Sequence, residues 1–322
     1  MTTLSVIIDT LAAQGAGNLA VHLVAADGTT LPAFEAGAHV DVHLPNGLIR
    51  QYSIASSPHQ REHYVLCVRR EPASRGGSAY VHDQLRVGQR LAISLPRNLF
   101  ALEPAGHYLL MAGGIGITPL LAMAEALDAA GTPFELHYYV RERGHAAFAR
   151  RLAAGFRHGA VHVHCDAEGS NPANRLPEGL DTPGAARRLY LCGPDGFMRY
   201  VTDTALQRGW NEAQIHREAF GPAPVPTAPA ATDGAFEVEL ASNGQVFSVP
   251  ADKTIAAVLC EAGVEVPLSC EMGMCGACLT PVVAGQADHR DTVQSEAEKA
   301  SPNQYVTLCC SRSLTPRLVI GL

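Results

Sequence analysis

Cysteines near the C-terminus constrain the fold of this chain more than any other feature. Cys270, Cys275 and Cys278 form a C-x4-C-x2-C segment, and Cys309 and Cys310 follow 30 residues later. This spacing is typical of plant-type [2Fe–2S] ligation, in which each of two irons takes two thiolates. We predict a tight cluster-binding loop over 270–278, completed by a fourth thiolate from a distant part of the chain.

Structural zinc is the alternative, because it also takes four cysteines. Zinc sites usually contain paired C-x2-C knuckles, whereas this loop has one such pair and one x4 spacing. Gly273 and Gly276 would let the backbone wrap closely and direct N–H groups towards the sulfurs. The spacing therefore favours iron, but it leaves open whether Cys309 or Cys310 is the fourth ligand.

A Pro- and Ala-rich segment divides the chain. Residues 221–234 read GPAPVPTAPAATDG, a composition that forms neither helix nor strand and behaves as an extended spacer. It separates a module of residues 235–322 from the rest. With 322 residues in all, the chain is long enough for two or three domains.

Two patterns of secondary structure precede this linker. Residues 1–103 contain short alternating apolar runs separated by Pro and Gly turns, which predicts an antiparallel barrel. Residues 104–220 alternate strands with helices, which predicts a parallel sheet covered by helices. We expect strands at 108–112, 134–140, 161–165 and 189–192, and helices at 119–130, 146–154 and 197–208.

Charge and hydropathy exclude several classes of partner. The net charge is −7 and no basic run is present, so we expect no nucleic-acid binding. Residues 104–124 carry no charge over a membrane-spanning length, but their glycines and Pro119 predict a strand, a turn and a helix, and no membrane span. The first basic residue is Arg50, so we expect no secretory signal and a cytoplasmic protein.

A glycine-rich turn follows the first strand of the α/β region. Gly113, Gly114 and Gly116 precede Thr118 and Pro119, which we predict to be the N-cap and first residue of the next helix. Such a turn binds dinucleotide phosphates, because glycine admits close approach and the helix N-terminus offers free N–H groups. It is not a G-x-G-x-x-G sequence, and alone it is a weak signal.

A second turn, Cys192-Gly193-Pro194, also ends a predicted strand, where a cysteine is most often an inert buried side chain. The two turns together resemble the nicotinamide-binding half of the ferredoxin-NADP reductase superfamily. The resemblance implies that the first turn holds the pyrophosphate, that Thr118 and Pro119 lie near the nicotinamide, and that Cys192, Gly193 and Pro194 lie beside the site of hydride transfer.

The adenosine end of the nucleotide should meet Arg141-Glu142-Arg143, which ends the next predicted strand. A 2′-hydroxyl is bound by a carboxylate and a 2′-phosphate by Arg or Lys. Glu142 thus favours NADH, while Arg141 and Arg143 keep NADPH open.

Two short motifs in the predicted barrel complete the pattern. Arg50-Gln51-Tyr52-Ser53 and Arg75-Gly76-Gly77-Ser78 are unremarkable alone. With the other motifs they resemble the flavin barrel of the phthalate dioxygenase reductase and vanillate demethylase reductase family. The resemblance implies that Tyr52 and Ser53 contact an FMN ring and that Arg, Gly and Ser hold its phosphate. The FMN candidates it implies are Arg50, Tyr52, Ser53, Val68, Arg69, Arg75, Gly76, Gly77, Ser78 and Phe220.

The resemblance covers nearly the whole chain and implies a multidomain fold. Its parts are an FMN-binding antiparallel β-barrel (1–103), an NAD-binding α/β domain (104–220) and, after the linker, an α+β ferredoxin domain of β-grasp type (235–322). In plant-type ferredoxins the last ligand is the cysteine of a Cys-x-Ser-Arg pattern, which this sequence has as Cys309-Cys310-Ser311-Arg312. The resemblance therefore implies Cys309.

The same resemblance implies an NADH-dependent reductase, with Cys192, Ser53 and Thr118 at the reacting centre. FMN and the [2Fe–2S] cluster would convert hydride transfer into single-electron transfer. The expected partner is a terminal Rieske-type oxygenase acting on an aromatic or similar small substrate. A reductase for a cytochrome P450 or a small electron carrier is one alternative. A redox-sensing or zinc-stabilised binding protein without turnover is another.

Overall fold

A computed structural model describes residues 3–72, 74, 76–220, 234–268, 271, 273–274, 276–291, 293–294 and 296–322. The chain forms two compact units, residues 1–220 and 221–322. Each unit is described by itself below. The finer division at 103/104 and 234/235 stays a prediction.

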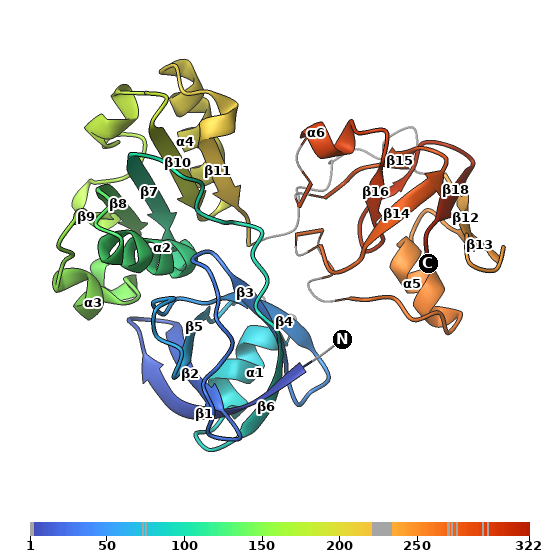
Figure 1. The fold of residues 1–322 in the computed structure, drawn as a ribbon, viewed down its shortest axis with the longest axis horizontal. Coiled ribbons are helices and arrows are strands. Elements are labelled where there is room, and N and C mark those ends of the chain that lie inside the picture. Colours follow the sequence, from blue (N-terminus) through green and yellow to red (C-terminus); the bar gives the residue numbers. More distant parts are fainter. Residues whose placement is uncertain are drawn as a thin grey trace. The chain divides into compact units, whose positions relative to one another are not determined.

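The first unit begins with a six-stranded antiparallel barrel (Figure 1). Its strand order is β4-β3-β6-β1-β2-β5, and a bridge between Ile54 and Leu66 joins the two edge strands into a closed barrel. Helix α1 (Gly77–Gln84) follows β5. The strands are β1 (Thr3–Ala13), β2 (Asn18–Ala25), β3 (His39–His43), β4 (Ile49–Ser53), β5 (Tyr64–Arg69) and β6 (Arg90–Ser94).

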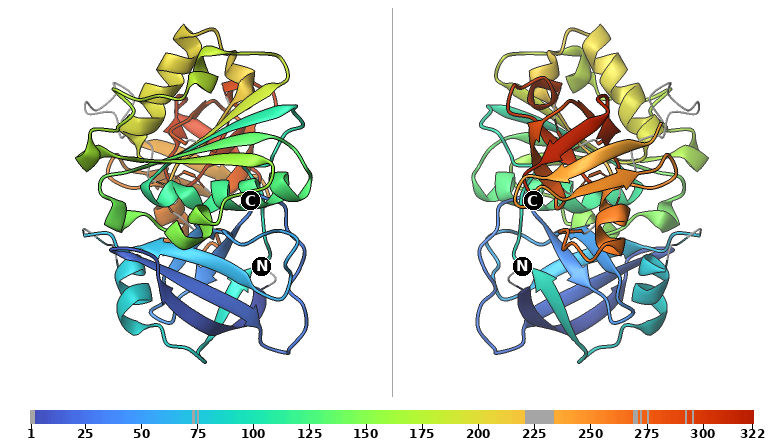
Figure 2. Two further views of the ribbon diagram at one scale, coloured as in Figure 1. Left: turned by 90° about the vertical axis from the view of Figure 1, so that its left-hand side faces the viewer. Right: turned by 90° about the vertical axis from the view of Figure 1, so that its right-hand side faces the viewer.

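The second part of this unit is a five-stranded parallel sheet in the order β11-β10-β7-β8-β9. Helix α2 (Ile117–Ala129) covers one face and α4 (Asp195–Gln207) the other, as Figure 2 shows. The strands are β7 (His107–Gly113), β8 (Phe134–Val140), β9 (Gly159–Cys165), β10 (Arg187–Cys192) and β11 (Ile215–Glu218). Both predicted fold classes in residues 1–220 are confirmed, although β11 was not predicted.

The bounds of all three predicted helices differ from those observed, and α4 begins at Asp195 where residue 197 was predicted. Helix α2 already begins at Ile117, so Thr118 lies inside it and its hydroxyl donates to Ile115 O at 3.1 Å. The predicted N-cap role of Thr118 is therefore wrong. Helix α3 covers only Ala149–Ala153, because Phe148 adopts a left-handed backbone conformation (φ 56°) that ends any helix arriving from residue 146.

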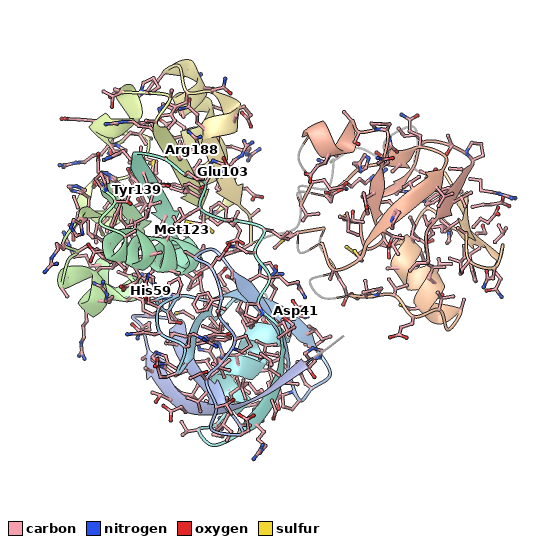
Figure 3. The ribbon with its side chains drawn as sticks, viewed as in Figure 1. Asp41, His59, Glu103, Met123, Tyr139 and Arg188 are labelled. Carbon is pink, nitrogen blue, oxygen red and sulfur yellow. The ribbon has the colours of Figure 1, made fainter. Side chains whose placement is uncertain are left out.

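The segment that leaves the barrel is attached to the parallel sheet. Glu103 pairs with Arg188 of β10 at 3.8 Å, and the two side chains lie close together in Figure 3. The Tyr190 hydroxyl donates to Ala101 O at 3.0 Å and accepts from Glu103 N at 2.7 Å. These contacts join the barrel and the sheet into one unit, which positions a site between them.

The second unit is a mixed sheet with a packed helix, in the strand order β13-β12-β18-β14-β16. Strands β12 and β18 are parallel, and helix α5 (Ile255–Glu261) starts at Thr254, whose hydroxyl accepts from Ala257 N at 3.1 Å. The predicted α+β class is confirmed. The remaining elements are β12 (Phe236–Leu240), β13 (Val246–Val249), β14 (Leu279–Ala284), β15 (Ala287–Asp288), α6 (Glu296–Lys299), β16 (Tyr305–Thr307), β17 (Arg312–Ser313) and β18 (Arg317–Ile320).

No helix within the described residues is long and apolar enough to cross a membrane. The uncharged segment 104–124 forms β7, a glycine turn and the first part of α2, as the sequence predicted.

Candidate functional site

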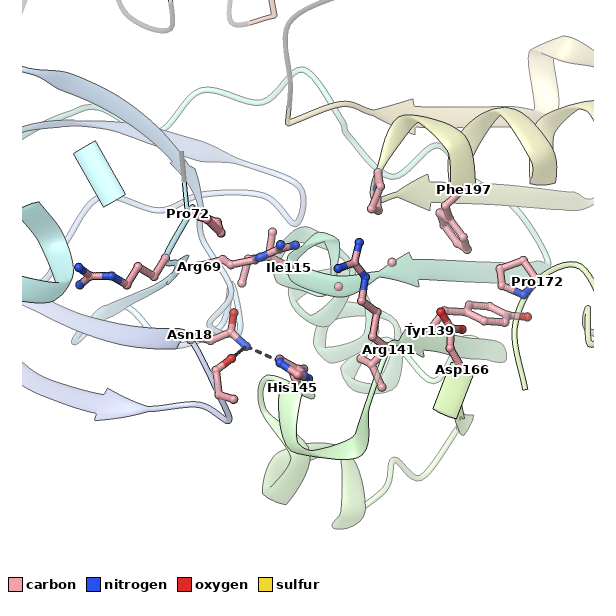
Figure 4. A pocket seen from close by; sticks show the side chains of 17 residues that line it. Asn18, Arg69, Pro72, Ile115, Tyr139, Arg141, His145, Asp166, Pro172 and Phe197 are labelled. Carbon is pink, nitrogen blue, oxygen red and sulfur yellow. Dashed lines mark hydrogen bonds between the residues drawn. The ribbon is translucent and has the colours of Figure 1, made fainter. Parts of the chain in front are cut away.

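A pocket of about 410 Å³ opens at the carboxyl ends of the parallel strands (Figure 4). Turns after β7, β8, β9 and β10 all contribute to it, and this edge of a parallel sheet is where ligands bind in such folds. The sheet lines the pocket with Gly113, Gly114, Ile115, Tyr139, Val140, Arg141, His145, Asp166, Pro172, Pro194 and Phe197. The predicted residues Gly113, Gly114, Arg141 and Pro194 thus meet around one cavity.

The barrel forms the other side of the pocket. Arg69 ends β5 and Arg70 follows it, while the β1–β2 turn contributes Ala16 and Gly17, and Asn18 begins β2 directly after this turn. The Asn18 amide donates to His145 O at 3.0 Å across the junction, which fixes this turn against the sheet domain. Arginine side chains beside a glycine-rich turn make the pocket suitable for a phosphate-bearing ligand.

The two predicted turns pack directly against each other. A Cβ atom on Gly116 would lie 2.1 Å from Cys192 O, so only glycine allows this approach. Gly113 and Gly193 are also in close contact. Gly116 therefore has a packing role, whereas the sequence had predicted that it binds phosphate.

Five of the predicted nucleotide residues do not line the pocket: Gly116, Thr118, Pro119, Cys192 and Gly193. Thr118 and Pro119 are buried in α2, and Cys192 is completely buried. Burial and the nearby charge of Glu218 raise the pKa of the Cys192 thiol well above its usual value. Cys192 is therefore held as a neutral thiol and is not poised as a nucleophile.

Ser53 and Cys192 meet at a carboxyl group that the sequence analysis missed. Glu218 ends β11 directly beside Cys192 of β10, and the Ser53 hydroxyl donates to Glu218 Oε2 at 3.4 Å. Burial raises the pKa of Glu218 to about 8, against the opposing effect of the Ser53 hydrogen bond. Glu218 could have been found from its position at the carboxyl end of β11, the strand next to β10. Finding it requires that β11 be predicted first.

The charged groups on the adenosine side differ from those predicted. Asp166, at the end of β9, lines the pocket with Arg141, whereas Glu142 and Arg143 do not. Both oxygens of Glu168 accept from the Arg143 guanidinium, so that guanidinium already has a partner. The carboxylate on the pocket wall is thus Asp166, which the strand pattern alone had not singled out.

The barrel contains a second arrangement suited to a phosphate. The Arg50 side chain passes so close to the start of α1 that a Cβ on Gly77 would lie 2.6 Å from Arg50 Nε. A guanidinium next to a helix N-terminus combines a charge with free N–H groups. The predicted Arg50, Gly76 and Gly77 are therefore brought together, and they fit the phosphate of a flavin mononucleotide.

Other flavin candidates have structural contacts of their own. The Ser78 hydroxyl donates to Ser74 Oγ and accepts from Glu71 N, both at 3.1 Å. Val68 O accepts from His82 of α1 at 2.9 Å. Burial raises the pKa of Tyr52 to about 12, so its phenol stays protonated. Phe220 is exposed at the end of the unit, and Arg75 lies outside the described residues.

Part of the predicted cluster site is described in the second unit. Cys278 and Cys309 are buried, and their sulfurs are within hydrogen-bonding contact, as expected for two ligands of one metal centre. A Cβ on Gly273 would lie 2.5 Å from Cys310 Sγ, so Cys310 packs against the ligand loop. Cys270 and Cys275 lie outside the described residues. The sulfur donors that are described fit an iron–sulfur centre.

Comparisons with known proteins agree with this geometry. Residues 238–314 match the family model of the 2Fe-2S iron-sulfur cluster binding domain. A vanillate O-demethylase oxidoreductase from Pseudomonas sp. is 48% identical over 320 residues, which cover 99% of this chain and 100% of that protein.

Two solved structures are similar over almost the entire chain. Phthalate dioxygenase reductase, described as a modular structure for electron transfer from pyridine nucleotides to [2Fe–2S], matches with a TM-score of 0.73 and 36% identity, covering 99% of this chain and 98% of that one. An intact type IV self-sufficient cytochrome P450 monooxygenase matches with a TM-score of 0.88 and 34% identity, covering 99% of this chain and 41% of that one.

Proposed function

Because the chain belongs to the family of oxidoreductases that includes vanillate O-demethylase oxidoreductase and phthalate dioxygenase reductase, we propose that it carries electrons from NADH through FMN to a [2Fe–2S] cluster. The observation that supports this most is the pocket at the strand ends, shared between the sheet and the barrel. The barrel side of this pocket includes Arg69 at the end of β5, and β5 is bridged through Leu66 to Ile54, the residue after Ser53.

In this proposal the pocket binds NADH in an extended form. The turn at Gly113 and Gly114 receives the pyrophosphate together with Arg69, and Asp166 accepts a hydrogen bond from the adenosine ribose. A carboxylate at that position disfavours the 2′-phosphate of NADPH by charge repulsion. This assigns the preference for NADH to Asp166, where the sequence had assigned it to Glu142.

We place the reacting centre beside the Gly113 end of the pocket, near Ser53, Cys192 and Glu218, none of which lines the pocket itself. With a pKa of about 8, Glu218 is mainly protonated at neutral pH, so it adds no negative charge beside the groups that exchange a hydride. Ser53 and Glu218 orient each other, and the buried Cys192 excludes water from this end. Thr118 supports the turn by its bond to Ile115 O.

FMN is proposed to bind in the barrel with its phosphate at Arg50, Gly76, Gly77 and Arg75. When bound, it accepts two electrons together and releases them one at a time, which a [2Fe–2S] cluster requires. Tyr52, Ser53 and the backbone of Val68 and Arg69 would contact the ring, with Phe220 as an aromatic cover. Cys270, Cys275, Cys278 and Cys309 would hold the cluster.

Relatives in this family are reductase components that pass electrons to a terminal oxygenase, and we propose such a protein as the acceptor here. A cytochrome P450 domain is the second candidate, because the P450 monooxygenase structure contains a region similar to this whole chain. Residues 235–322 carry ten acidic and five basic side chains, a net charge of −5. This acidic excess would favour docking on a basic surface of the acceptor.

We also propose a cytoplasmic location, where NADH is the available reductant and thiols stay reduced. No disulfide joins the described cysteines.

The test is the rate at which each pyridine nucleotide bleaches the flavin absorbance of the purified full-length chain in an anaerobic stopped-flow experiment. We expect NADH to reduce the flavin at least about tenfold faster than NADPH at equal concentration, because one unfavourable charge contact costs about 1.4 kcal/mol or more. Asp166→Ala should lower the ratio of the flavin reduction rate with NADH to that with NADPH. A chain without flavin absorbance, or with no response to NADH, would refute the proposal.

A further inference from the structure

A chain of hydrogen bonds crosses three strands beneath the nucleotide pocket, and no role described above uses it. His107 of β7 contacts Glu135 Oε1 of β8 at 3.3 Å, and Glu135 Oε2 contacts His137 Nε2 at 3.3 Å. His137 Nδ1 lies 3.1 Å from His164 Nε2 of β9, and His164 Nδ1 lies 3.0 Å from Ser170 Oγ. One side chain from β7, two from β8 and one from β9 thus connect the centre of the sheet to the loop after β9.

The charge of Glu135 sets the direction of every bond in this chain. Burial raises the pKa of Glu135, but hydrogen bonds from His137 and His107 outweigh it and hold the pKa below its usual value. An ionised carboxylate only accepts, so His137 carries its proton on Nε2 and accepts at Nδ1. His164 must then donate from Nε2 and accept the Ser170 hydroxyl proton at Nδ1.

Both imidazoles remain neutral at physiological pH. Burial lowers the pKa of His137 to about 4, with Glu135 opposing and His162, stacked on it at 4.6 Å, adding to the effect. Burial also lowers the pKa of His164 to about 4, and nearby His137, His162 and Arg175 reinforce this. His137 and His164 therefore stay uncharged, and keep the same hydrogen bond between them, at physiological pH.

This pair touches the pocket wall at two points. The His164 ring stacks on Tyr139 at 4.3 Å, and Tyr139 lines the pocket. Ser170 begins the loop that brings Pro172 to the pocket, and the Tyr139 hydroxyl donates to Arg175 O of the same loop at 2.9 Å. Figure 4 shows Tyr139, Asp166 and Pro172 together on this side of the pocket.

We propose that His137 and His164 form a neutral, tautomer-fixed pair that positions Tyr139 and the loop 166–175 as the adenosine-side wall of the nucleotide pocket. They are positioning residues, because they act through Tyr139 and Ser170. The inference rests on the proposed function, since it requires that the pocket binds a dinucleotide.

Binding of ADP-ribose to the full-length protein tests the proposal, because this probe carries the adenosine, the pyrophosphate and the second ribose but no nicotinamide, and therefore cannot donate a hydride. Ser170→Ala removes one hydrogen bond between the pair and the loop. We expect its Kd for ADP-ribose, measured by calorimetry at pH 7.5, to rise about 2- to 10-fold, the effect of one net hydrogen bond. Thr204→Ala, which removes an exposed hydroxyl bond on α4, is the matched control and should bind as the parent protein does.

A second variant and a spectroscopic measurement guard against simple misfolding. The double variant His137→Phe/His164→Phe keeps ring stacking on Tyr139 and leaves no unpaired imidazole between the strands. It should retain the flavin spectrum and weaken ADP-ribose binding. Nitrogen chemical shifts of the parent protein should show both imidazoles with the proton on Nε2.

The possible results distinguish a failure of the proposed function from a failure of the positioning role. If the parent protein does not bind ADP-ribose, the proposed function of the pocket fails. If the parent protein binds but Ser170→Ala and the double variant bind equally well, or if either imidazole is protonated on Nδ1, the positioning role is refuted and the proposed function stands.

Discussion

At the scale of single residues, Glu218 shows how position can matter more than residue type. It was visible in the sequence only as a charged neighbour of Phe220, yet β11 places it beside Cys192 and within reach of Ser53. Its partly buried carboxyl group is uncharged at neutral pH because burial raises its pKa to about 8. An ordinary surface glutamate would be fully ionised there.

This pKa predicts how Glu218→Gln changes stability with pH. The folded state binds the carboxyl proton up to about pH 8, whereas the unfolded chain releases it near pH 4.5, so the parent protein loses stability as pH rises between these values. Glutamine does not titrate. We expect the Tm of the variant, relative to the parent, to increase steadily from pH 5 to pH 8.5. A constant difference in Tm across this range would show that Glu218 is ionised throughout.

The choice between Cys309 and Cys310 is also a question about single residues. Cys309 contacts both Cys278 and Cys310, and Cys310 packs on Gly273, so we retain Cys309 as the proposed ligand and test it directly. We predict that Cys309→Ser abolishes the cluster, measured as iron and acid-labile sulfide per chain, while flavin reduction by NADH continues. Cys310→Ser is the matched control and should retain the cluster. The reverse pattern would assign the ligand to Cys310.

At the scale of elements, the sequence predicted what local patterns encode. Strand 134–140 was predicted with its observed bounds, because apolar side chains and flanking turns define it locally. Strand β11 was missed because it is short and is stabilised by pairing with β10, a contact that no local pattern records. The start of α2 was misplaced because Gly116 packs against Cys192, and this contact allows the helix to begin before Thr118.

The same limit applied to the candidate site. Gly113, Gly114 and Arg141 were identified by their place after predicted strands, and they do line the pocket. Asp166 follows a predicted strand too, but nothing in the sequence showed that its turn, and not Glu142, reaches the cavity. The histidines of β8 and β9 were also invisible as a group, because only the register of the parallel sheet brings them together.

Buried His137 of β8 and His164 of β9, together with buried His39 of β3, predict that the first unit loses stability in acid. Burial lowers the pKa values of His39, His137 and His164 to about 4, against 6.5 in an unfolded chain, so their contribution to stability is complete above pH 6.5 and is lost as pH falls towards 4. The single tryptophan, Trp210, is buried in the sheet domain and reports its unfolding. The urea concentration at the unfolding midpoint, measured by Trp210 fluorescence, should decrease as the pH is lowered from 6.5 to 4.5.

The double variant His137→Phe/His164→Phe provides the control for this experiment. Two of the three titrating groups are absent from it, so its urea midpoint should depend less on pH than that of the parent protein. Equal pH dependence in both proteins would show that other groups cause the acid lability.

At the scale of the whole molecule, each of the two units has its own core and is proposed to carry out a different step of electron transfer. The first combines the proposed nucleotide pocket with a barrel in which Arg50 lies beside Gly77, and the second matches a 2Fe-2S cluster binding domain. This division follows from the chemistry, because hydride transfer needs a two-electron carrier and a [2Fe–2S] cluster accepts one electron. Electron transfer from NADH to the cluster therefore requires both cofactors in one chain.

Anaerobic titration of the purified full-length chain with NADH tests this most directly. FMN takes two electrons and the cluster one, so the flavin and iron–sulfur absorbance should both be bleached, with an endpoint at about 1.5 NADH per chain. An endpoint at about one NADH, with the iron–sulfur absorbance unchanged, would contradict electron transfer between the two units.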